Sequence, residues 1–165
     1  MIVNFLNKTE VAKPVRDEIQ RVMEKALEVL KQKALVEINI GFVSKEEIQS
    51  VNSKERNKDV PTDVLSFPAS NVKVGEVIDI TKDEYKYNIN PENEAFSLGD
   101  MIICLEVAKA QAKSFKHSLK DELVRLSLHS LLHCLGYDHI EDKDYEIMHK
   151  LELGVAKLCG YDFEE

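Results

Sequence analysis

Three of the five histidines of this chain, His129, His133 and His139, fall within one stretch of eleven residues. An α-helix advances about 100° per residue, so His129 and His133 lie one turn apart on the same helix face. Gly136 follows them, and glycine readily adopts the left-handed conformation that ends many helices, which lets the chain turn and bring His139 back. Three converging neutral imidazoles with one open coordination position are typical of a catalytic zinc site. The sequence therefore predicts a zinc site at the end of a helix.

The spacing H-x-x-x-H-x-x-G-x-x-H also matches the frame of the metzincin peptidases, with one difference. Those enzymes have a glutamate directly after the first histidine, whereas this chain has Ser130, which cannot act as a carboxylate base. The pattern thus predicts a metal site that is unsuited to standard zinc peptidase chemistry.

The first two histidines lie on residues 119–135, whose leucines recur at helical spacing and predict a deeply buried helix. Apolar or alternating runs predict strands, and amphipathic runs predict further helices. The expected strands cover residues 1–6, 36–43, 61–68 and 101–105, and the other expected helices cover residues 14–33, 44–56, 107–115 and 142–159. This order favours an α+β (mixed α/β) fold with a mixed sheet of about four strands, about five helices and the zinc site at the end of the buried helix.

The segment from about residue 69 to 97 fits this pattern poorly. Residues 77–80 form a candidate strand, but the following polar stretch is interrupted by Pro91. We expect a surface insertion, with the character of a mobile loop, within a single domain that spans residues 1–165.

Composition limits the cellular setting and the partners. No run of eighteen apolar residues occurs, the N-terminus lacks the basic and apolar regions of a signal peptide, and the three cysteines are widely spaced. We therefore expect a cytoplasmic protein that does not engage a membrane. The net charge of −8 gives no general support for nucleic-acid binding. The basic residues at 54–58 and 109–125 form either a local basic patch or ordinary solvated helix faces.

Four segments together resemble the YbeY family of metal-dependent endoribonucleases. They are Val51–Arg56, the run Asp59-Val60-Pro61-Thr62-Asp63-Val64-Leu65-Ser66-Phe67-Pro68, Leu98-Gly99-Asp100-Met101-Ile102-Ile103, and His129–His139. Met148 and Glu152 are also similar to the closing part of the family. Two departures are Ser130, where the family usually has glycine, and Cys134, where leucine is common.

The resemblance implies a single-strand-specific, zinc-dependent endoribonuclease that acts in ribosomal RNA maturation and ribosome quality control. His129, His133 and His139 are the implied ligands of one zinc ion, with nickel as the alternative metal. The implied partners are RNA, in particular single-stranded rRNA, and a ribosomal subunit or ribosomal proteins.

The resemblance also places a catalytic arginine at Arg56, whose guanidinium can pair with phosphate in a bidentate manner. Asp63, Asp100 and Asp138 are the acids closest to the motifs. Asp138 could orient an imidazole as a hydrogen-bond acceptor, and Asp63 or Asp100 could do the same or cap the backbone at a strand end. We expect structural roles for these acids rather than general-base catalysis.

Two other functions remain open from the sequence. One is a metzincin-like zinc peptidase, which the missing glutamate argues against. The other is a non-catalytic zinc-containing module that docks on the ribosome. A structural zinc site normally has four protein ligands, and Cys104 or Asp100 could supply the fourth only if the fold brings it close.

Overall fold

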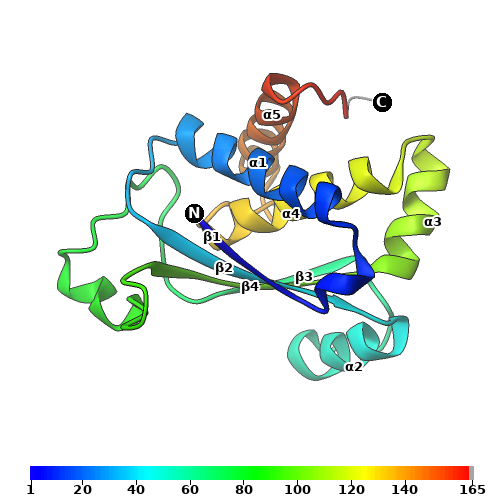
Figure 1. The fold of residues 1–165 in the computed structure, drawn as a ribbon, viewed down its shortest axis with the longest axis horizontal. Helices are drawn as coiled ribbons and strands as arrows, with labels where there is room; N and C mark the ends of the chain where they lie inside the picture. Colours follow the sequence, from blue (N-terminus) through cyan, green and yellow to red (C-terminus); the bar gives the residue numbers. More distant parts are fainter. Residues whose placement is uncertain (164–165) are drawn as a thin grey trace.

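The computed structural model describes residues 1–163, which form a single mixed β-sheet with five α-helices (Figure 1). The predicted domain also included residues 164–165, which lie outside the described residues. The strands are β1 (Ile2–Leu6), β2 (Val36–Val43), β3 (Val64–Pro68) and β4 (Phe96–Cys104). The helices are α1 (Lys13–Val29), α2 (Lys45–Arg56), α3 (Leu105–Phe115), α4 (Leu119–Cys134) and α5 (Asp142–Leu158), with short 3₁₀ helices η1 (Lys8–Glu10) and η2 (Asp83–Asn88). The predicted mixed α/β fold is confirmed.

The sheet has the strand order β1-β2-β4-β3. β1, β2 and β4 run parallel, and β3 pairs antiparallel with β4 at the edge of the sheet. Side chains alternate between the two faces of a strand. Ile40 and its partner Met101 are buried on the face covered by α1 and α4, whereas their neighbours Asn39 and Asp100 point to the other face, where α2 lies (Figure 1).

Helix α4 is the predicted buried helix, and its packing leaves one stripe accessible. Ser118 and Asp121 form a capping box at its N-terminus, which fixes where the helix begins. From residue 121 to residue 134, the only positions that are not buried are Asp121, Arg125, His129 and His133. These positions are four residues apart, so they form one stripe along the helix. The same stripe carries the first two predicted metal ligands.

Helix α1 is shorter than predicted, because the sequence pattern continues to residue 33 but the helix ends at Val29. Lys31 adopts a positive φ of 59°, which an α-helix does not accommodate. No helix within residues 1–163 combines the length and hydrophobicity needed to cross a membrane.

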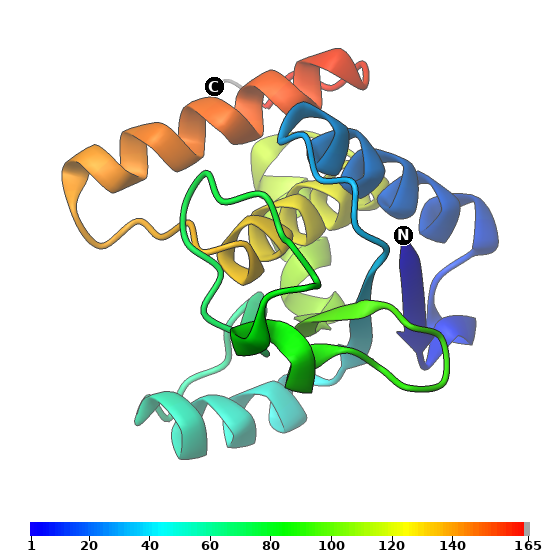
Figure 2. The same ribbon diagram turned by 90° about the vertical axis from the view of Figure 1, so that its left-hand side faces the viewer.

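Residues 69–95 pass beside the C-terminal end of α4 and pack onto the core (Figure 2). Val72, Ile78 and Tyr85 in this segment are buried. The candidate strand at 77–80 is wrong, because the backbone N–H of Ile78 donates to the side-chain carbonyl of Gln32 at 2.9 Å rather than to a neighbouring strand. The amide of Gln32 in turn donates to the carbonyl of Glu76 at 2.7 Å, so one side chain holds this part of the segment. That the segment is an insertion stays a prediction.

Candidate metal centre

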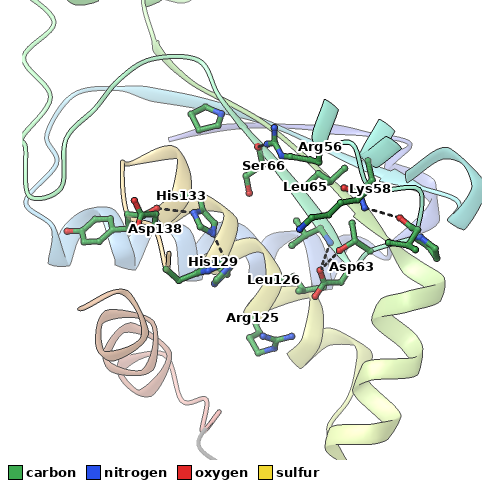
Figure 3. Close-up of a pocket in the computed structure, with 18 of the residues that line it drawn as sticks. Arg56, Lys58, Asp63, Leu65, Ser66, Arg125, Leu126, His129, His133 and Asp138 are labelled. Carbon is green, nitrogen blue, oxygen red and sulfur yellow. Dashed lines mark hydrogen bonds between the residues drawn. The ribbon is translucent and has the colours of Figure 1, made fainter. Parts of the chain in front are cut away.

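The three motif histidines converge at the C-terminal end of α4. Figure 3 shows the rings of the first two, His129 and His133, next to each other. One ligand atom from each of His129, His133 and His139 lies within 4.8 Å of the other two. Gly136 makes this convergence compatible with the chain path, because its φ of 95° reverses the backbone directly after the helix. The spacing in the sequence thus produces a cluster of three imidazoles in space.

Hydrogen bonds at the far side of two rings orient their metal-facing nitrogens. Nδ1 of His133 donates to the backbone carbonyl of Tyr137 at 2.9 Å, and Nδ1 of His129 donates to the carboxylate of Glu152. A carbonyl or carboxylate oxygen only accepts, so a ring hydrogen lies on Nδ1, and in the neutral ring the free lone pair is then on Nε2. This is the arrangement in which metal-binding histidines are usually held.

The two Nε2 atoms of His129 and His133 lie 3.0 Å apart. In neutral rings with hydrogen on Nδ1, this contact places two lone pairs face to face, and a cation between them would remove the repulsion. Two nitrogens bound tetrahedrally to one zinc at about 2.0–2.1 Å would be about 3.3 Å apart, which is close to the observed separation. The donor set and its spacing therefore fit a metal ion.

Burial keeps His133 neutral over the physiological pH range. Its pKa is lowered to about 4, first by burial and then by the neighbouring His129 and His139. A neutral imidazole is the form that binds metal. Cys134, the next residue along the helix, is buried, and burial raises the pKa of its thiol to about 12, as expected for a structural thiol rather than a ligand.

Ser130 links the metal helix to the edge strand. Its side chain is fully buried, and its hydroxyl lies 2.6 Å from the hydroxyl of Ser66 on β3. In this chain, the position that carries the glutamate base in metzincins therefore holds a packing contact between α4 and β3.

The imidazoles open into a cavity of about 770 Å³ that extends across β3 to the end of α2. Three cationic side chains line it: Arg56, Lys58 and Arg125. Figure 3 shows Arg56 and Lys58 across the cavity from His129 and His133. Three of the basic residues in the segments 54–58 and 109–125 thus share one cavity with the histidines, and the others do not line it.

The contacts of Arg56 hold its side chain without neutralising its charge. One guanidinium nitrogen donates to the backbone carbonyl of Ser66 at 2.9 Å, and the group lies over the ring of Phe67 at 5.2 Å from the centroid. Neither contact involves a carboxylate. Arg125 differs, because both its Nε and an Nη nitrogen donate to the carboxylate of Glu122.

The three candidate acids are placed differently. Asp63 and Asp138 line the cavity. The carboxylate of Asp63 accepts from the backbone N–H of Val64 at 2.8 Å, and that of Asp138 accepts from the N–H of Ile140 at 3.4 Å. Asp100 is on the opposite face of the sheet, where it accepts from Asn39 at 2.8 Å, and it does not line the cavity.

Two residues beside the histidines received no site role from the sequence. Glu152, the acceptor of the His129 hydrogen bond, lies on α5, and no short spacing connects it with the motif. Arg125 precedes His129 by four residues, so the same helical periodicity that linked the histidines could have indicated it.

Comparison with known proteins identifies the family of this chain. The sequence model of the family described as Endoribonuclease YbeY matches residues 1–162. The chain belongs to this family. A protein named Endoribonuclease YbeY from Finegoldia magna is 38% identical over 170 residues, which cover 100% of this chain and 99% of that protein. One from Clostridium botulinum (strain Kyoto / Type A2) is 36% identical over 157 residues, 94% of this chain and 95% of that protein.

A solved structure shares the fold. A Thermotoga maritima protein determined in solution superposes with a TM-score of 0.53 over 95% of this chain and 91% of its own. The two sequences are 22% identical, so this similarity supports the fold alone. The resemblance to the YbeY family noted in the sequence is confirmed.

Proposed function

We propose that this chain is a zinc-dependent endoribonuclease that cleaves single-stranded segments of ribosomal RNA during rRNA maturation and ribosome quality control. The observation that carries the proposal is the cavity shared by the three converging imidazoles and Arg56. Its volume of about 770 Å³ lies within the range of small-molecule sites, which suits one nucleotide of a single strand better than a duplex. Membership in the YbeY family supports RNA as the substrate.

His129, His133 and His139 would hold the metal ion through their ring nitrogens. Three neutral nitrogen donors suit zinc, and nickel accepts the same ligands. When bound, the ion supplies either a polarised phosphoryl oxygen or a water of lowered pKa. The protein holds two of the rings in place, because the Glu152 carboxylate accepts from His129 and the Tyr137 carbonyl accepts from His133.

Arg56 would bind the phosphate that is cleaved. Negative charge grows on the phosphoryl oxygens during cleavage, and a fixed guanidinium stabilises it. The carbonyl of Ser66 and the ring of Phe67 hold Arg56 in position at the cavity wall. Because Glu122 already pairs with Arg125, Arg56 is the better candidate of the two for this role.

The peptidase alternative lacks a base at the expected position. Ser130 is fully buried and hydrogen-bonded to Ser66, and it has no carboxylate, so it cannot act as the general base of a peptidase. The docking-module alternative lacks a fourth ligand, since the cluster found in residues 1–163 has three members. Cys104 packs with Ile48 and Leu65 on the α2 side of the sheet.

We also propose that a ribosomal subunit or its proteins present the RNA to this site. This part rests on the family and not on a contact surface of the chain. Cosedimentation of the metal-loaded protein with each purified ribosomal subunit tests it. Protein that stays in the supernatant whichever subunit is pelleted contradicts it.

The nuclease proposal is tested by incubating zinc-loaded protein with single-stranded RNA, with and without a chelator. We expect cleavage that the chelator abolishes and that His133→Ala lacks. Tyr87→Ala is the control, because Tyr87 is 90% exposed, does not line the cavity and lies outside the three-histidine group. Cleavage that survives both the chelator and His133→Ala would refute the proposal, and hydrolysis of casein would support the peptidase.

A second pair of variants tests the arginine. Arg56→Ala should retain zinc but lose about 10²–10³-fold in cleavage rate, the size of effect found when one group stabilising developing charge is removed. Arg16→Ala is the control, because Arg16 also donates to a backbone carbonyl (Val11, 3.1 Å) and lies over a phenylalanine ring (Phe5, 5.9 Å). Equal activities of the two variants would remove Arg56 from the mechanism.

A further inference from the structure

A second cavity of about 770 Å³ begins where the metal-site cavity ends. Arg125 and His129 line both cavities, so the two spaces meet along the accessible stripe of α4. The second cavity lies between the end of α3, α4, α5 and the residues that follow α5. A strand of RNA with a phosphate at the histidines would therefore have a neighbouring space for an adjacent nucleotide.

Aromatic rings form much of the wall of this second cavity. Phe115, Tyr145 and Phe163 line it, and Phe115 and Tyr145 remain 46% and 50% exposed. Tyr145 stacks on His149 with 5.2 Å between ring centroids and 14° between the planes. The guanidinium of Arg125 lies over the Phe115 ring, 5.6 Å from its centroid, so Phe115 and Tyr145 each have at most one face left for a base. An open ring face is the surface on which the bases of single-stranded nucleic acids stack.

The charges of the cavity favour a base over a phosphate as the ligand. The cations are Lys116 and Arg125, and the guanidinium of Arg125 is paired with the fully buried carboxylate of Glu122. Two acids, Glu152 and Asp162, also line the wall. Among the described residues of this wall, the lysine and arginine do not outnumber the acids, so the cationic excess that a phosphate would need is not found there. Stacking needs only an accessible ring face.

We propose that the second cavity binds a base of the RNA strand, next to the cleaved phosphodiester, by stacking on Tyr145 and Phe115. The proposal rests on the ribonuclease function proposed above, because the occupant of the first cavity defines where the strand enters. It adds a binding site on α3 and α5 to a metal site built on α4. Stacking of this kind tolerates any base, so the site contributes affinity and strand position rather than sequence preference.

The test measures binding to a non-cleavable probe, so that it does not depend on turnover. A short fluorescein-labelled 2′-O-methyl oligoribonucleotide is titrated with zinc-loaded protein, and fluorescence anisotropy gives the Kd. Loss of one stacked base weakens affinity by about five- to hundredfold, which we expect for Tyr145→Ala. Tyr87→Ala is the matched control, because Tyr87 is 90% exposed and lines neither cavity, and it should bind as the wild type does.

Phe115→Leu provides a second variant that preserves an apolar side chain, and we expect it also to weaken binding. The same 2′-O-methyl probe with one internal 2-aminopurine should lose fluorescence when it binds the wild type and lose less when it binds Tyr145→Ala. Wild-type affinity in both Tyr145→Ala and Phe115→Leu would overturn the stacking site and leave the metal-site proposal standing. Failure of the wild type to bind the probe would overturn both.

Discussion

Gly136 allows a strong test of how the metal-site turn is built. It has a φ of 95°, and a Cβ added to it would lie 2.1 Å from the backbone oxygen of Val72. Val72 belongs to the 69–95 segment, so Gly136→Ala would push that segment away from the turn that carries His139. The substitution should lower the free energy of unfolding for two separate reasons: alanine disfavours the left-handed backbone conformation, and its Cβ collides with the backbone of Val72.

Other glycines of the chain separate these two costs. Gly154 is helical and open, so Gly154→Ala should stabilise the protein by about 0.5–1 kcal/mol. Gly160 has a φ of 89° and also faces open space, so Gly160→Ala should cost about 1–2 kcal/mol from conformation alone. Gly136→Ala adds about 1–3 kcal/mol for the collision, which gives a total of about 2–5 kcal/mol.

The free energy of unfolding from urea denaturation of the three variants provides the comparison, with metal removed so that binding does not contribute. We expect the order of stability Gly154→Ala, wild type, Gly160→Ala, Gly136→Ala. Zinc affinity should fall in Gly136→Ala alone, because only that change displaces the turn before His139. Equal stabilities of Gly136→Ala and Gly160→Ala would refute the close packing of Val72 on this turn.

Three further predictions concern the same site. Glu152→Gln should weaken zinc affinity by about 10–100-fold, because the carboxylate that accepts from His129 is lost; competition with a chromophoric chelator measures this, and an unchanged Kd would contradict it. The metal-free protein should lose stability as pH falls from about 6.5 toward 4, because His133 has a pKa of about 4 in the folded protein and is protonated first in the unfolded chain. Urea denaturation at several pH values should show this fall in the free energy of unfolding in the wild type and a smaller fall in His133→Gln. Ser130→Ala should lower the free energy of unfolding by about 1 kcal/mol, because the hydrogen bond to Ser66 is lost. Ser66→Ala should then lower it less in the Ser130→Ala background than in the wild type, and strictly additive losses would argue against the 2.6 Å contact.

The local part of the site could be predicted from the sequence. Two histidines four residues apart on a helix, followed by a glycine turn and a third histidine, converge through backbone geometry that spans eleven residues. The buried helix was predictable for the same reason, since its leucines recur with the helical period. The capping serines, Ser44 and Ser118, fix the starts of α2 and α4 by local contacts of the same kind.

The non-local part could not be read from spacing. Glu152 reaches His129 only because α5 folds back along α4, and Asp100 points away from the site because β4 pairs with β2 in the register that aligns it with Asn39. Residues 69–95 look like a polar surface segment, yet Tyr85 in that segment is 3% exposed. Its burial depends on contacts with the core that are set by the packing of the whole domain.

We propose that one metal ion, held by three histidines, is needed for cleavage of RNA. The deciding experiment returns zinc stepwise to chelator-treated protein while bound metal and the rate of RNA cleavage are measured in the same samples. We expect both to rise together and to saturate at one ion per chain, with neither response in His139→Ala. Full cleavage in the metal-free protein, or in a His139→Ala variant that binds no zinc, would contradict the claim.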